Sequence, residues 1–150
     1  MRLQIVLKDL VARWEYSEKL REVIESILNI YNGEPMLPWA GFIAMETAGC
    51  SGEEVVGMCA FKTVPVNNRV EIICRTFPEY EGTGVATKMT ELLMKIARRA
   101  NPNITLIART VPEESAAVTI LKKHGFVNIG TVTDPEGSAA WEWVLDAIRN

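Results

Sequence analysis

Two glycines, Gly82 and Gly84, stand where a buried strand gives way to a helix, and Pro78 marks the link between the two elements. Glycine has no Cβ atom, so a ligand can approach the backbone closely at these positions. The first turn of the following helix presents unpaired N–H groups and the positive end of the helix dipole. This combination predicts a cradle for an anion, and a diphosphate is a suitable ligand.

Several kinds of nucleotide-binding loop use glycines in this way, and the neighbouring residues distinguish them. A Walker A loop needs a lysine directly after its last glycine, where this chain has Val85 and Ala86. A dinucleotide-binding loop needs three glycines directly after the strand. Here Thr87 holds the third place, and residues 78–81 come before Gly82. The pattern therefore excludes a Walker A loop and gives only a weak dinucleotide fingerprint.

Residues 78–86 resemble the phosphate loop of the GCN5-related N-acetyltransferase (GNAT) superfamily, which accounts for the proline, the tyrosine and both glycines. The family pattern is arginine or glutamine, two residues, glycine, one residue, then glycine or alanine, and it falls on Glu81, Gly84 and Ala86. Residues 112–126 resemble the later helix of the family, which ends in Gly-Phe. The closing residues 141–143 resemble the ends of ribosomal-protein-type acetyltransferases.

The resemblance implies a fold, a coenzyme and its contacts. The fold is α+β, with a central mixed sheet of about seven strands flanked by helices, in which the fourth and fifth strands splay apart. The coenzyme is acetyl-CoA, used as a cosubstrate, whose pantetheine arm pairs with the freed edge of the fourth strand at Cys74, Arg75 and Thr76. The diphosphate would lie on the loop and the helix start, at Gly82, Thr83, Gly84, Val85, Ala86 and Thr87.

The resemblance also implies an activity, the transfer of an acetyl group to a primary amine of a small molecule or a protein by direct attack in a ternary complex. An amine is protonated at neutral pH, so the enzyme needs a base. Glu71 is our candidate because it is an acidic residue in a largely apolar strand, where burial would raise its pKa. A solvated sheet face, or a pair with Arg69 or Arg75, accounts for Glu71 equally well.

Other polar residues could also face the reaction. Glu46 and Glu142 could line the acceptor side, although strand alternation equally places either one in water. His124 is the single histidine, and its place before a glycine suits a helix C-terminus better than proton transfer.

Three positions depart from the family pattern. Glu81 brings a carboxylate close to the expected phosphates, where repulsion would weaken binding by around 1 kcal/mol. Glu114 replaces an asparagine that bonds the pantetheine arm, and a carboxylate can accept a hydrogen bond but cannot donate one. Leu121 replaces the tyrosine that protonates the leaving thiolate, so no general acid is assigned. Because of these departures, two alternatives to the enzyme stay open. The first is a non-catalytic acyl-CoA-binding regulatory module, and the second is a Rossmann-like nucleotide binder.

The remaining segments must supply the scaffold for these residues. Apolar patterns predict strands over residues 3–8, 39–47, 54–64, 70–77 and 104–109, followed by a closing strand that carries residues 141–143. Helical periodicity predicts helices over residues 17–33, 85–100 and 112–125. The strands over 39–47, 54–64 and 70–77 form an antiparallel meander, and the whole chain, residues 1–150, is one domain.

Composition limits the partners. The net charge of −3 over 150 residues argues against nonspecific binding to nucleic acid or an anionic membrane. No apolar run is long enough to span a bilayer, and the first residues lack a signal-peptide cleavage site, so we expect a cytoplasmic protein. Three widely spaced cysteines and one histidine suggest neither a disulfide framework nor a metal site. An exposed C-terminal strand would permit a homodimer.

Overall fold

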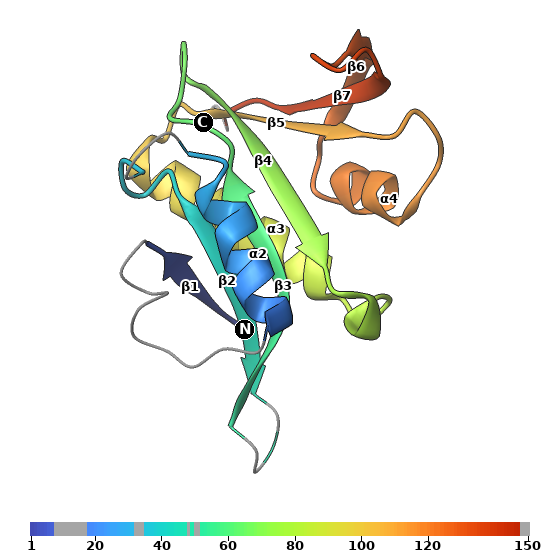
Figure 1. Ribbon diagram of the computed structural model, residues 1–150. Coiled ribbons are helices and arrows are strands. Elements are labelled where there is room, and N and C mark those ends of the chain that lie inside the picture. The colour runs from blue at the N-terminus through green and yellow to red at the C-terminus, as the bar shows by residue number, and fades with distance from the viewer. Residues whose placement is uncertain (8–17, 32–34, 48, 50–51, 148–150) are drawn as a thin grey trace.

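The computed structural model of the chain describes residues 1–7, 18–31, 35–47, 49 and 52–147. Its strands form one seven-stranded mixed sheet in the order β1-β2-β3-β4-β5-β7-β6 (Figure 1). The strand bounds are β1 (Arg2–Val6), β2 (Gly41–Thr47), β3 (Glu53–Phe61), β4 (Arg69–Thr76), β5 (Thr105–Thr110), β6 (Val127–Thr133) and β7 (Ala139–Leu145). The predicted α+β architecture, with a mixed sheet of about seven strands, is confirmed.

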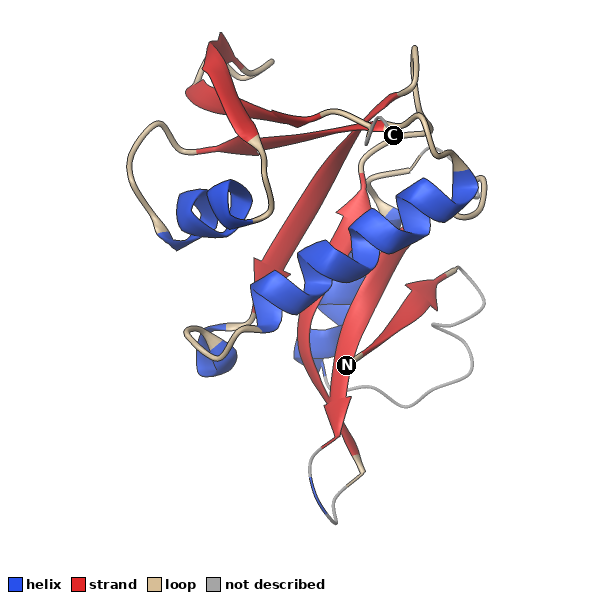
Figure 2. Ribbon diagram, turned by 180° about the vertical axis from the view of Figure 1, so that it is seen from behind, coloured by secondary structure: helices blue, strands red, loops and turns tan. Residues whose placement is uncertain are grey.

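The helices cover both faces of this sheet. They are α2 (Glu18–Leu28), α3 (Val85–Ala100), α4 (Ala116–Lys123) and the short 3₁₀ helix η2 (Pro78–Tyr80). Helix α2 packs on one face through Ile24 and Ile27, whereas α3 covers the opposite face through Met89 and Leu93 (Figures 1 and 2). No helix in the described part of the chain is long and apolar enough to cross a membrane.

Strands β2, β3 and β4 form the predicted antiparallel meander, with β1 added beside β2. The turn between β3 and β4 is closed by a bridge between Val66 and Arg69. Its two central residues, Asn67 and Asn68, have φ angles of 53° and 60°. A two-residue hairpin loop of this kind needs positive φ at both central positions, and asparagine accepts that conformation more readily than most residues. The meander places β4 in the middle of the sheet.

The helix bounds differ from the predicted ones at α4. We expected a helix from residue 112, opened by Glu113 and Glu114, but α4 begins at Ala116. Ser115 is the N-cap, and its side chain accepts a hydrogen bond from the Val118 N–H at 3.3 Å. A serine oxygen that satisfies a first-turn amide fixes the helix start, so both acids lie outside the helix. Both predicted ends of the first helix, at residues 17 and 33, fall outside the described residues. Cys50, one of the three cysteines, also falls outside them.

One hydrophobic core joins the two halves of the sheet. It combines Phe42 and Phe61 on β2 and β3 with Leu106 on β5 and Trp143 on β7. Helix α4 contributes Val118 and Leu121 to the same cluster, so α4 lies on the α3 face of the sheet. A second cluster, under α2, is confined to the β1 to β3 side of the molecule. The sheet face of β4, β5 and β7 that points away from α3 is therefore not part of either core.

Candidate functional site

The central feature of the sheet is a split between β4 and β5. In the described structure these strands pair in parallel at three positions, Arg69↔Thr105, Val70↔Leu106 and Glu71↔Ile107. Beyond Glu71, β4 continues along β3 and β5 continues along β7, so the two strands diverge (Figure 1). A cavity of about 240 Å³ occupies the split, lined by β4, β5, α3 and α4. Drug-sized ligands usually need roughly 300–1,000 Å³, so this volume suits a slender chain.

A glycine-rich loop leads from the end of β4 to the start of α3. Gly82 and Gly84 have φ angles of 77° and 84°, a region that side-chain-bearing residues avoid. A Cβ atom on either glycine would meet nothing within 4 Å. The backbone conformation therefore explains both glycines, and the space above them is open to a ligand.

The start of α3, where the sequence predicts an anion site, has backbone amides that precede the helical hydrogen bonds. Gly84 is the N-cap of α3 and has no capping side chain. The first helical hydrogen bond runs from the Lys88 N–H to the Gly84 carbonyl at 3.1 Å, so the amides of Val85, Ala86 and Thr87 precede the helical ladder. Ala86 also lines the cavity, which places the helix start beside the split. The predicted diphosphate site and the cavity are thus neighbours.

Contacts within the loop hold it against the sheet. The Thr83 hydroxyl donates to the Tyr80 carbonyl, and the Tyr80 hydroxyl donates to Glu54 Oε2 at 3.1 Å. Glu81, the acidic departure from the family pattern, is exposed. Its charge is therefore open to screening by solvent and salt.

The expected coenzyme edge, Cys74 to Thr76, forms the end of β4. Cys74 lines the cavity, and its Sγ lies 3.7 Å from Thr90 Oγ1 on α3. Burial raises the pKa of the Cys74 thiol to about 11, so the residue is a neutral thiol at physiological pH. Arg75 is exposed, and Thr76 is half-buried and paired with Gly57 on β3. Cys74 thus has the character of an apolar wall residue and not of a nucleophile.

Glu71 lies at the apex of the split and lines the cavity. Its carboxylate is 3.7 Å from the Lys62 ammonium and 3.8 Å from the Arg109 guanidinium. Arg109 lies on β5 and contacts Glu142 on β7 at 3.3 Å. The sequence suggested Arg69 or Arg75 as partners of Glu71, but the observed cations come from Lys62 and from the adjacent strand β5.

Arg109 was missed as a site residue. It is the one charged residue of the predicted strand over 104–109, and it stands at the carboxyl end of that strand. Carboxyl ends of strands in α/β sheets commonly carry ligand contacts, and this was the available signal. Glu46, another acid considered, is not among the residues that line the cavity, and it pairs with Lys88 at 3.4 Å.

The residues in and beside α4 that the family pattern covers differ in whether they reach the cavity. Leu121 lines the cavity, so an apolar side chain stands where the family pattern places a tyrosine. Glu114 is exposed and pairs with Lys122 at 3.5 Å. His124 caps α4, where Nδ1 is 2.8 Å from the Ile120 carbonyl and Nε2 is 3.3 Å from Glu91 Oε1 on α3. These contacts suit a structural role for His124 between two helices.

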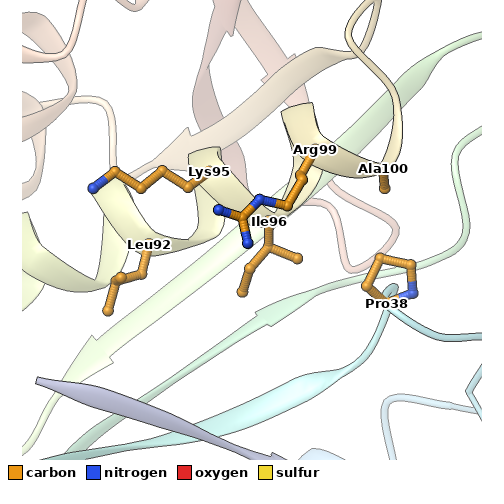
Figure 3. Close-up of a pocket in the computed structure, with 6 residues that line it drawn as sticks. All are labelled: Pro38, Leu92, Lys95, Ile96, Arg99 and Ala100. Carbon is orange, nitrogen blue, oxygen red and sulfur yellow. The ribbon is translucent and has the colours of Figure 1, made fainter.

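A second hollow, of about 480 Å³, lies along the C-terminal half of α3. Figure 3 shows its lining, with Lys95, Arg99, Leu92, Ile96 and Ala100 from the helix and Pro38 opposite them. No carboxylate, hydroxyl or thiol belongs to that lining. The described lining of this hollow therefore offers no carboxylate that could act as the expected base. In the described part of the chain, no group of three His, Cys, Asp or Glu residues could hold a metal ion.

Comparison with known proteins agrees with this geometry. A family model for the acetyltransferase (GNAT) domain matches residues 4–127. No curated protein sequence matches the chain.

Solved structures share the fold at low identity. A putative phosphinothricin N-acetyltransferase has a TM-score of 0.71 at 15% identity, with 99% of each chain covered. The ribosomal-protein-S18-alanine N-acetyltransferase from Escherichia coli has a TM-score of 0.67 at 10% identity, covering 99% of this chain and 96% of that one. The NatC complex bound to Gag peptide and CoA has a TM-score of 0.61 at 19% identity, covering 94% and 87%. The family match spans most of the chain, and the fold and the loop agree with it: the protein belongs to the GNAT acetyltransferase family.

Proposed function

We propose that this protein is an acetyl-CoA-dependent N-acetyltransferase that acts on a primary amine of a small molecule or a protein. The observation that carries the proposal is the junction of two features at Ala86, where the cavity between β4 and β5 meets the glycine-rich start of α3. A slender cavity ending at an anion-binding helix start suits a ligand with a narrow arm and a diphosphate. Family membership and the CoA bound to the NatC neighbour support the same ligand.

The residues present fit acetyl-CoA. Cys74 lines the split, and β4 is unpaired with β5 beyond Glu71, so its edge at Cys74, Arg75 and Thr76 would offer backbone groups to an amide-bearing arm. The open amides of residues 82–87 would hold the diphosphate, and Glu114, which precedes α4, would accept a hydrogen bond from the pantetheine arm as the family pattern implies. The thioester would supply an activated acetyl carbonyl carbon. The protein must orient it and remove a proton from the amine.

Glu71 is the proposed base, because it is the carboxylate that lines the cavity. It would take a proton from the ammonium form of the acceptor, and the free amine nitrogen would then bond to the acetyl carbon. As the carbon–sulfur bond breaks, the sulfur leaves with one proton and the second proton passes to solvent. No covalent enzyme intermediate is needed, and this agrees with the neutral thiol of Cys74.

A second candidate, a non-catalytic acyl-CoA-binding module, is favoured by one observation. Leu121 puts a hydrocarbon side chain on the cavity wall where a general acid would protonate the leaving sulfur. A module of this kind would bind acetyl-CoA and release no thiol.

Calorimetric titration with acetyl-CoA, followed by a thiol-release assay with amines and basic peptides, tests both functions. We expect binding, and release of free CoA thiol when the right amine is added. Binding without release from any acceptor would favour the regulatory module. Absence of binding would overturn both proposals, and a fluorescence titration with NAD would then test the dinucleotide alternative.

A further inference from the structure

A row of four alternating charges crosses the split on one face of the sheet. It runs from Lys62, at the end of β3, to Glu71 on β4, Arg109 on β5 and Glu142 on β7. Strand alternation places the last three on the face away from α3, because neighbours such as Val70, Ala108 and Trp143 belong to the α3 core. The row therefore lies on the face of the sheet opposite α3 and α4, the helices that line the rest of the cavity.

The contacts within the row are not equivalent. Glu142 holds Arg109 with hydrogen bonds of 3.4 Å from Nε and 3.3 Å from Nη2, both to Oε1. Glu71, in contrast, is 3.8 Å from Arg109 Nη1 and 3.7 Å from Lys62 Nζ, which is too long for a hydrogen bond. Glu142 thus fixes the guanidinium and leaves Nη1 directed toward Glu71.

The Glu71 carboxylate and Nη1 of the Arg109 guanidinium both retain unused hydrogen-bonding capacity. Within the described part of the chain, no donor lies within hydrogen-bond distance of the Glu71 carboxylate, although its side chain is only 19% exposed. A half-buried carboxylate without direct hydrogen bonds favours any donor that can reach it. Glu71 and Arg109 are also the two charged residues in the described lining of the cavity. A ligand entering there meets one anion and one cation side by side.

This pair restricts the chemistry of the acceptor. An ammonium group would donate to Glu71, whereas Arg109 would repel a second positive charge and attract an anion. The two protein groups are 3.8 Å apart, so the ligand must carry its own charges equally close together. A polyamine lacks the anion. A peptide N-terminus offers a neutral carbonyl next to its ammonium, which forms a weaker bond with a guanidinium than a carboxylate does.

We propose that the acceptor is a small zwitterion with its ammonium and carboxylate on the same carbon atom, an α-amino acid or a close analogue. Glu71 binds the ammonium, and Arg109 selects the carboxylate. This inference rests on the proposed acetyl transfer and uses the same bond changes, so the product is an N-acetyl amino acid together with free CoA thiol.

The first test compares matched acceptors in the thiol-release assay. Each proteinogenic α-amino acid is measured beside its carboxamide and beside the amine that lacks the carboxylate, at one saturating concentration of acetyl-CoA. We expect at least one amino acid to react with a kcat/KM about tenfold or more above both of its analogues, because the analogues lose a charge-assisted hydrogen bond. Equal or faster reaction of the amides or amines would overturn the inference and leave the acetyltransferase proposal standing. Binding of acetyl-CoA with no release from any acceptor would overturn both the inference and catalysis.

The second test changes Arg109. In Arg109→Gln we expect KM for the preferred amino acid to rise about tenfold or more, and kcat/KM to fall at least about tenfold further for the amino acid than for the matched amine. Arg109→Lys keeps the charge but loses the planar fork, so it should recover part of the affinity. Arg69→Gln, an exposed arginine at the start of β4, is the matched control.

A purely structural role for Arg109 makes a different prediction. Loss of the Glu142 contact would then disturb the apex and depress the amino acid and the matched amine equally. Affinity for acetyl-CoA, measured on the same variants, reports whether the fold is intact. Parallel loss of both acceptors with that affinity retained would overturn the selection of the carboxylate by Arg109.

Discussion

Glu71 shows how a single residue can satisfy two requirements of the proposed reaction. It lies at the apex of the split, where it lines the cavity, and its carboxylate stands between the side chains of Lys62 and Arg109. A base must be within reach of the proton that it removes, and Glu71 is the acid that meets this condition in the described cavity lining.

Glu71→Gln should lower kcat by about 100-fold or more, because glutamine cannot accept the proton of the ammonium. Steady-state thiol release at saturating acceptor measures kcat, with acetyl-CoA affinity as the control for folding. An unchanged kcat would assign Glu71 to ion pairing alone.

Cys74 offers a test of the environment inside the split. Its thiol has a pKa of about 11 in place of 9.0, because burial disfavours the thiolate. This rise in pKa corresponds to a thiolate fraction about 100-fold lower at neutral pH. We expect alkylation of Cys74 by iodoacetamide, followed by peptide mass spectrometry, to be about 100-fold slower at pH 7.5 than that of a small free thiol. The rate should rise steeply up to pH 11. Rapid labelling at pH 7.5 would mean that the thiol is not buried as described.

At the scale of elements, the start of α3 combines a backbone conformation that favours glycine with an open surface. Gly84→Ala puts a Cβ atom on a residue with a φ of 84° and should cost about 1–2 kcal/mol of unfolding free energy. Gly84→Glu adds a negative charge beside the proposed diphosphate site. Its affinity for acetyl-CoA should therefore fall at least about tenfold below that of Gly84→Ala.

The chain offers a matched control for this pair of variants. Gly137 has a φ of 88°, and a Cβ atom there would also meet nothing within 4 Å, but it lies in the turn between β6 and β7. Gly137→Ala should cost similar stability and leave coenzyme affinity unchanged. Denaturant unfolding and calorimetry separate the two quantities. Equal coenzyme affinity in wild type and Gly84→Glu would place the diphosphate elsewhere.

Local patterns were sufficient for some elements and not for others. The loop and α3 could be predicted because turn residues, apolar periodicity and the stop at Asn101 all lie within one stretch of sequence. The start of α4 was misplaced because the cap formed by Ser115 outweighs the two acids that precede it. The pairing of Glu71 with Arg109 could not be predicted, because it depends on β5 lying parallel to β4, and that register is decided by the packing of the whole sheet.

At the scale of the whole molecule, strand β6 forms one edge of the sheet. Its seven residues carry no charge and no proline, and Val127 and Ile129 are 63% and 55% exposed. Uncharged edge strands rich in β-branched residues are templates for pairing with another chain. An antiparallel pair of β6 strands would bring no like charges together. The bulge beside Ile129 twists the strand, so the homodimer that we predict should be weak.

Sedimentation velocity over a range of protein concentrations tests this association. We expect the mean mass to rise with concentration for the wild type. In Ile129→Lys the rise should shift to higher concentration, because a charge would replace an exposed apolar side chain on the edge strand. Val66→Lys, which alters an exposed apolar residue in the turn between β3 and β4, should behave as the wild type. A single mass at every concentration would exclude the dimer.

The three paired positions between β4 and β5 make the middle of the sheet an unfinished ladder. A ligand that fills the split and bonds to the free edge of β4 would serve as a temporary strand, and it would bind the folded chain and not the unfolded one. By mass action, such a ligand adds to the free energy of unfolding in proportion to the logarithm of its concentration. The survival of this protein in the presence of proteases would then follow the supply of the metabolite that it consumes.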